Sequence, residues 1–130
     1  MTFKGADVSE IDDLAADLSR AGLRAATEAV AVVHRGANNI QRDARSFAPS
    51  GPRTPAYPYS ITYDLKIGGD RIVAEVGPDK DLPQGPLGNI LEYGTSTQGP
   101  QAHLGPAFDR EAPNFEKYIA ELGANLLGLR

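Results

Sequence analysis

Residues 23–47 read LRAATEAVAVVHRGANNIQRDARSF, and this stretch decides the fold. Its apolar residues recur every three or four positions, which places them along one side of an α-helix. They are Leu23, Ala26, Val30, Val33, Ala37, Ile40, Ala44 and Phe47. The helix ends before Pro49, because a residue that precedes proline avoids the α-helical conformation. The pattern predicts one helix of about 25 residues, roughly 37 Å long.

A shorter apolar repeat precedes this stretch. Its members Ile11, Leu14, Ala15 and Leu18 are at helical spacing, and Ser9 followed by Asp12 resembles a weak capping box. The segment is also acidic, and negative charge near a helix N-terminus is favourable against the helix dipole. The acidic residues are Asp7, Glu10, Asp12, Asp13 and Asp17. We expect an irregular lead over residues 1–7 and then a helix, which Gly22 either breaks or bends.

The other face of the long helix carries arginines that project within about 80° of one another on a helical wheel. They are Arg20, Arg24, Arg35, Arg42 and Arg45. Three interpretations are open: a solvated basic face, an electrostatic seam for the acidic first segment of the same or a neighbouring subunit, or a contact with passing nucleic acid. The formal net charge of −4 argues against a nucleic-acid coat, which needs clustered positive charge. We expect these arginines to face protein.

Downstream of the long helix, residues 48–58 contain four prolines and a glycine, which predicts a long projecting loop without regular structure. Residues 60–67 then alternate apolar and polar side chains, and residues 71–76 do the same after a turn at residues 68–70. This is a β-hairpin. Two strands alone are marginally stable, so one face of the hairpin is expected to pack on the long helix.

The last third of the chain connects a second loop, residues 79–88, to a short helix or turn at residues 87–93. There Leu91 and Tyr93 are expected to pack on the hairpin, and Glu92 is expected to cap or pair. Gly94 then supplies the backbone freedom that a chain reversal needs. A final helix is predicted from Pro106. Pro113 is expected to kink or divide it, with Asn114 capping a second piece.

Length and composition bound the class of protein. The 130 residues suffice for one domain with one core, and the absence of cysteine excludes disulfides and thiolate metal sites. No apolar run approaches the 18 residues of a membrane span, and the N-terminus lacks a secretory signal pattern. We therefore expect a single α+β domain over residues 1–130: one long helix and a C-terminal helix packed on a small antiparallel β-sheet, with long Pro/Gly-rich loops.

Motifs of enzyme chemistry are missing from the sequence. It has no Gly-x-Gly-x-x-Gly, Walker, Gly-x-Ser-x-Gly or zinc-ligand spacing. The histidines His34 and His103 lie far apart and outside any ligand spacing, and a surface or subunit contact is the expected role of His34. We expect no catalytic residues, no metal and no cofactor, so the protein is predicted not to be an enzyme.

Two blocks near the C-terminal end carry a resemblance. Leu91-Glu92-Tyr93-Gly94-Thr95, a polar spacer, and Gly105-Pro106-Ala107-Phe108 at the start of the final helix resemble the head–tail joining, or tail-completion, family of long-tailed bacteriophages. The Ala48-Pro49-Ser50-Gly51 segment after the long helix is similar to an Ala-Pro-x-x-Thr-Gly segment of that family. His103-Leu104 stands where the family has Pro-Phe, so the second block matches less closely.

The resemblance implies a structural subunit of the phage neck or tail end, which forms a ring, sixfold or a multiple, between head connector and tail tube. Its partners would be its own copies and the neighbouring neck and tail proteins. DNA passes through without sequence-specific binding, and the protein is assembled in the host cytoplasm into the virion. The candidate contact residues are Arg24, Arg35, Arg42, Arg45, Arg53, Tyr57, Glu92, Tyr93 and Thr95, with Gly94 and Pro106 as structural hinges.

Two other functions remain open on the sequence. A small non-enzymatic adaptor or regulator that binds a cellular protein would use the same acidic surface and long loops. A defined higher-order self-association separates the ring subunit from the adaptor. A protein that contacts nucleic acid through the arginine face would instead show binding with a strong salt dependence.

Overall fold

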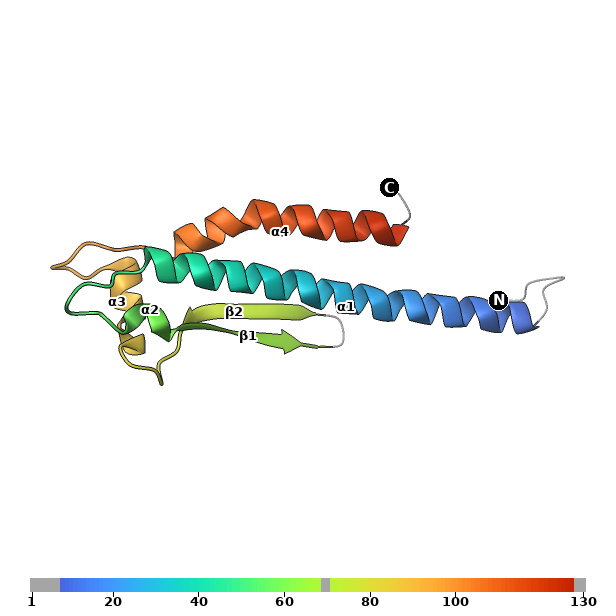
Figure 1. Ribbon diagram of the computed structural model, residues 1–130, viewed down its shortest axis with the longest axis horizontal. Helices are drawn as coiled ribbons and strands as arrows, with labels where there is room; N and C mark the ends of the chain where they lie inside the picture. The colour runs from blue at the N-terminus through green and yellow to red at the C-terminus, as the bar shows by residue number, and fades with distance from the viewer. Residues whose placement is uncertain (1–7, 69–70, 128–130) are drawn as a thin grey trace.

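The computed structural model describes residues 8–68 and 71–127. Its principal elements are helix α1 (Val8–Phe47), strands β1 (Ile61–Ile67) and β2 (Ile72–Pro78), and helix α4 (Leu104–Leu127). Three short elements join them: helix α2 (Tyr57–Ser60), the 3-10 helix η1 (Gly85–Leu87) and helix α3 (Gly88–Tyr93). In Figure 1, α4 runs along one side of α1 and the hairpin runs along the other. The predicted α+β class is confirmed.

Helix α1 is one continuous element of 40 residues. Gly22 does not break it, so the prediction of a possible boundary there is wrong. A glycine in a helix interior costs about 1 kcal/mol relative to alanine, which the helix-forming residues around it outweigh. Ser9 already lies inside α1 and is not its cap. The irregular lead expected over residues 1–7 lies outside the described residues.

The hairpin pairs β1 with β2 from Ile61↔Pro78 to Ile67↔Ile72. Because side chains alternate along a strand, the predicted apolar set shares one face, and both strands contact α1. Packing is deepest at the Ile61 end, where that side chain is fully buried, and Ile67 at the far end is 64% exposed. Residue 60 belongs to α2 and not to the strand, and the turn residues 69–70 lie outside the described residues.

The hydrophobic core gathers at the C-terminal end of α1. Its buried members are Ile40, Ala44, Ala48, Tyr57, Ile61 and Ala107, and Val76, Leu87, Leu91 and Leu104 pack against them. Of the predicted apolar stripe of α1, Ala37, Ile40 and Ala44 are buried, Val30 and Val33 are half-buried, and Ala26 and Phe47 are exposed. Leu23 is 71% exposed, and Figure 1 shows the N-terminal part of α1 extending past both the hairpin and α4.

Helix α4 runs unbroken through Pro113, so the predicted division of this helix and the capping role of Asn114 are wrong. The carbonyl that loses its helical partner to Pro113 belongs to Asp109, an exposed residue whose carbonyl water can reach. α4 starts at Leu104, which places Pro106 inside its first turn, where proline is tolerated.

Candidate functional site

The Glu92 carboxylate caps a helix from outside that helix. Glu92 lies on α3, and its Oε1 accepts hydrogen bonds from the backbone N–H groups of His103 (2.9 Å) and Leu104 (2.8 Å). Its Oε2 accepts a third from Gly105 (3.2 Å). These donors belong to the start of α4, whose first N–H groups have no partner within the helix. The prediction that Glu92 caps or pairs is confirmed.

This capping role leaves Glu92 only 8% exposed. Burial raises the pKa of the carboxyl, but the three backbone donors and the nearby His103 ring lower it by more, and the net pKa is below its ordinary value. The carboxylate is turned into the subunit and its oxygens are occupied. Its prediction as a partner contact is therefore wrong.

Tyr57 and His103 form a buried polar pair beside this cap. The Tyr57 hydroxyl lies 2.6 Å from His103 Nε2, and both side chains are fully buried. His103 Nδ1 faces two acceptors, the Gln101 carbonyl at 3.0 Å and Glu92 Oε1 at 3.2 Å. In the neutral ring Nδ1 therefore carries the proton, and Nε2 accepts from Tyr57.

The burial of Tyr57 has two consequences. Burial, together with the negative charge of Glu92, raises the pKa of Tyr57 to about 12. Its prediction as a partner contact is wrong, because one turn of helix after the proline-rich loop directs the ring into the core. Sequence reasoning missed the pair because nothing in the local pattern links Tyr57 to His103.

Gly94 and Thr95 carry the chain from α3 towards α4. Gly94 has φ 78° and ψ 179°, a conformation that side chains with a Cβ avoid, so its predicted role in a chain reversal is confirmed. Thr95 N–H donates to the Gln98 carbonyl at 2.8 Å. Gln101 N–H then donates to the Leu91 carbonyl at 2.7 Å. The change of direction is complete before Pro106, which is a helix residue and not a hinge.

Among the residues whose side chains the structure describes, Tyr93 is the most exposed large hydrophobic one, at 78%. The expectation that it packs on the hairpin is wrong. α3 turns Leu91 towards the core instead and leaves Tyr93 on the surface. Thr95 and Arg53 are exposed as well. These three predicted contact residues are accessible to a partner.

Three arginines of the predicted basic face are engaged within the chain. The Arg35 guanidinium lies 4.6 Å from the Tyr118 ring centre. Arg45 Nε donates to the Ile61 carbonyl at 3.0 Å, and Arg42 Nε lies 3.3 Å from Asp43 Oδ1. Arg24 is exposed.

Because α1 is one helix, its acidic first segment cannot fold back on the arginine face of the same chain. Only a neighbouring subunit is left to supply the acidic side of the predicted seam. That version of the seam remains a prediction.

The proline-rich loop is tied down rather than freely projecting. Gln84 accepts a hydrogen bond from Ala56 N–H at 2.7 Å through Oε1 and donates from Nε2 to the Arg53 carbonyl at 2.8 Å. Thr54 Oγ1 donates to the Pro49 carbonyl at 3.3 Å. Gln84 holds φ 64°, so the second loop is shaped around this bridge. The two loops form one surface at the C-terminal end of α1.

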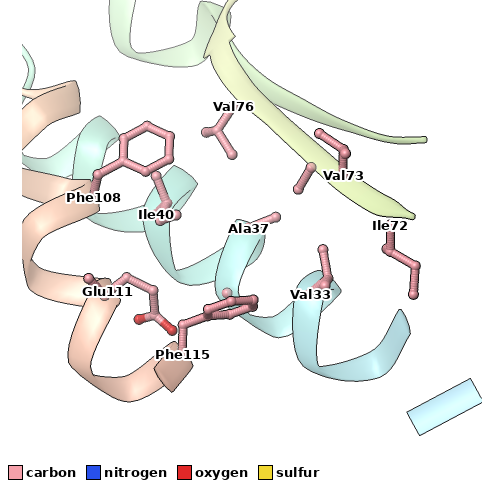
Figure 2. Close-up of a pocket in the computed structure, with 12 residues that line it drawn as sticks. Val33, Ala37, Ile40, Ile72, Val73, Val76, Phe108, Glu111 and Phe115 are labelled. Atoms are coloured by element: carbon pink, nitrogen blue, oxygen red, sulfur yellow. The ribbon is translucent and has the colours of Figure 1, made fainter. Parts of the chain in front are cut away.

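An open apolar groove of about 350 Å³ lies between α1, β2 and α4, and Figure 2 shows it. Its lining residues are Val33, Gly36, Ala37, Ile40, Ile72, Val73, Ala74, Val76, Phe108, Glu111, Ala112 and Phe115. The carboxylate of Glu111 is buried there and accepts from Asn39 Nδ2 at 3.2 Å on each oxygen. Sequence reasoning missed this groove, because it forms only where three elements distant in sequence meet.

Three further features are the position of His34, the grouping of possible metal ligands and the apolar character of the helices. His34 is on the surface, and its Nε2 lies 2.8 Å from the Tyr63 hydroxyl of the hairpin. Over residues 8–68 and 71–127, the acidic and histidine side chains form no group of three that suits a metal ion. Within the same ranges, none of the helices has both the length and the apolar character needed to cross a bilayer.

Comparison with known proteins identifies no relative of this chain. No family model, curated protein or solved structure matches the chain.

Proposed function

We propose that this chain is a structural subunit of a bacteriophage neck or tail end, which joins the head connector to the tail tube as a ring by protein–protein contacts. The observation that carries the proposal is the resemblance of the Leu91–Thr95 and Gly105–Phe108 blocks to the head–tail joining family. The structure supplies a physical reason for their spacing. Glu92 caps the helix that the second block begins, and Gly94 turns the chain between them.

The large accessible surface area of the chain supports a role as a subunit of an assembly. Its accessible surface is 9227 Å². A compact monomer of 13.8 kDa is expected to expose about 6,600 Å². The elongated arrangement in Figure 1 accounts for much of the difference, because α1 forms a rod and the core lies near its C-terminal end. Such a shape is favourable when neighbouring molecules cover part of it.

One end of the molecule suits contact with a different neck or tail protein. The loops tied by Gln84, together with α2 and α3, gather at the C-terminal end of α1 (Figure 1). Tyr59 is 72% exposed and Tyr93 78% exposed on these elements. Aromatic side chains are enriched at the centres of protein interfaces. The mechanism is binding: this end docks on the next ring, and joining depends on both partners being complete.

Quantitative mass spectrometry of purified particles, from the phage or lysogen that carries the gene, tests the proposal. We expect a small fixed copy number relative to the major tail-tube protein. Absence from clean particles would contradict the proposal and favour the adaptor function.

A joining assay tests the docking end. Tyr93→Ala should lower the yield of joined particles while the protein still folds, and Lys117→Ala, exposed on α4, should leave the yield unchanged. A deletion of the proline-rich loop must spare Tyr57, because that side chain belongs to the core.

A further inference from the structure

The N-terminal end of α1, residues 8–19, extends past both the hairpin and α4 in Figure 1, and its sequence is amphipathic. We call it the projecting segment. Its apolar residues Ile11, Leu14, Ala15 and Leu18 occupy positions i, i+3, i+4 and i+7 of the sequence. This is the spacing by which a helix anchors itself in an apolar groove. Leu23 continues the apolar series and is 71% exposed.

The groove between β2 and α4 is as long as this row of apolar residues. On α4 its lining runs from Phe108 to Phe115, and the anchors run from Ile11 to Leu18. Each range is eight residues of helix, which span seven steps or about 10.5 Å. Figure 2 shows Phe108 and Phe115 on one side of the groove, Val73 and Val76 on the other, and Ala37 and Val33 below. The contact surface is apolar apart from Glu111, whose carboxylate already accepts hydrogen bonds from Asn39, so a row of aliphatic side chains matches it.

The projecting segment cannot reach the groove of its own subunit. Val33, Ala37 and Ile40 of α1 line the groove, and the projecting segment is the continuation of the same unbroken helix. A helix cannot fold back on itself without a break, and none exists in α1. The segment and the groove are therefore available only to different molecules.

The area of exposed surface fits a subunit with two such contacts. A stable interface hides about 800 Å² on each partner. A subunit that gives its segment to one neighbour and its groove to another hides about 1,600 Å². The excess of this chain over a compact monomer is about 2,600 Å², which accommodates both.

We propose that the projecting segment of one copy docks in the β2–α4 groove of the next copy, with Ile11, Leu14 and Leu18 as its anchors. The contact joins two different surfaces, so it repeats head to tail, and it closes into a ring where the rotation allows. This inference depends on the proposed function only where it identifies the contact as the one that forms the phage ring. Self-association of the purified chain tests it without any phage.

The first experiment measures the mass of the purified full chain in solution at increasing concentration, by light scattering after size exclusion. Leu18→Gln removes an anchor, and Ala112→Gln places an amide at the exposed edge of the groove. Each should weaken self-association at least tenfold. The matched controls are Ala31→Gln on α1 and Ala120→Gln on α4, both exposed and outside the groove, which should associate as the wild type does.

Mixing the two defective variants identifies the contact as head to tail. The Leu18→Gln chain keeps an intact groove, and the Ala112→Gln chain keeps an intact segment. One good interface remains between them, so the mixture should form a one-to-one dimer and no larger species. Circular dichroism of each variant checks that the helices are intact, since leucine, alanine and glutamine are all adequate helix formers.

Cysteine cross-linking gives a second measurement, because the natural chain has no cysteine. A Leu14→Cys chain mixed with an Ala112→Cys chain should give a disulfide-linked heterodimer. Either chain alone should not cross-link.

Three results would overturn the proposal: a wild-type chain that stays monomeric, association that survives both groove and segment variants, or a mixture that fails to form the dimer. A wild-type ring held by other surfaces would refute the docking inference and leave the neck function standing. Absence of the protein from particles would refute the neck function and leave a measured self-association intact.

Discussion

Tyr57 and His103, 46 residues apart in the sequence, share a 2.6 Å hydrogen bond between the tyrosine hydroxyl and Nε2, with both side chains fully buried. The bond connects α2, which follows the proline-rich loop, to the start of α4. His103 is in turn held by Gln101 and Glu92. The pair thus links the two segments that close the core.

Tyr57→Phe should destabilise the fold by about 1–3 kcal/mol, because it leaves a buried ring nitrogen without its donor. Urea unfolding at neutral pH, followed by circular dichroism, measures the change in the free energy of unfolding. Tyr59→Phe is the matched control, since Tyr59 is 72% exposed, and it should change stability by less than about 0.5 kcal/mol. Equal stability of Tyr57→Phe and wild type would show that the bond contributes nothing.

Glu92→Gln should destabilise the protein by about 1–3 kcal/mol at pH 7, because the charged acceptor of three backbone donors is lost. The folded-state pKa of Glu92 is lowered. Its contribution to stability is therefore present above the unfolded value of about 4.3 and is lost as the pH falls through the lower folded value.

Urea unfolding of both proteins between about pH 7 and about pH 3 should show the gap between them narrowing in acid. Glu121→Gln, exposed on α4, should follow the wild-type curve. A gap that stays constant with pH would contradict the assigned role of the charge.

Alkaline stability should depend on Tyr57. Its pKa is raised to about 12, whereas an unfolded tyrosine ionises near 10. The stability that it contributes is full below about pH 10 and is lost as the pH rises towards about 12. The chain has five tyrosines and no tryptophan, so ultraviolet absorbance reports their ionisation cleanly. Tyr57→Phe should lack the latest step of the wild-type titration. A titration that keeps that step would assign it to another tyrosine.

Gly94→Ala should destabilise the turn before α4. The backbone at φ 78° and ψ 179° costs a residue with a Cβ about 1–3 kcal/mol. An added Cβ would also lie 2.7 Å from the Pro100 nitrogen and 2.8 Å from the Gln98 oxygen. Gly99→Ala is the control, because its Cβ would meet nothing within 4 Å. Thermal unfolding should separate the two variants, and identical melting would contradict the strain.

Periodicity predicted the elements that are long and one-sided. The α1 stripe and the hairpin alternation come from local side-chain spacing, and both appear in the structure. Boundaries were predicted less well. Gly22 and Pro113 are strong helix breakers, yet neither ends its helix. The free-energy cost of Gly22 is small beside the stability of the long helix around it. Pro113 leaves the carbonyl of Asp109 without a helical partner, but that residue is exposed and water can reach it.

The site residues also divide into those that the local sequence could predict and those that it could not. Gly94 was predictable, since only the backbone conformation of one residue is involved. The burial of Tyr57 and Glu92 was not, because it depends on His103 and on the start of α4, which are distant in sequence. Both side chains were predicted as partner contacts on the surface, and tertiary packing placed them inside.

The unbroken course of α1 past Gly22 has a mechanical consequence. The same unbroken helix lines the core near its C-terminal end and extends past α4 at its N-terminal end. A tilt of the helix about the core therefore moves the far end of the helix. From Ile40 in the core to Val8 the helix measures about 48 Å, and a tilt of roughly 5° about the core displaces its tip by about 4 Å. Small adjustments of packing around Ile40 and Ala44 are thereby converted into side-chain-sized movements at the far end.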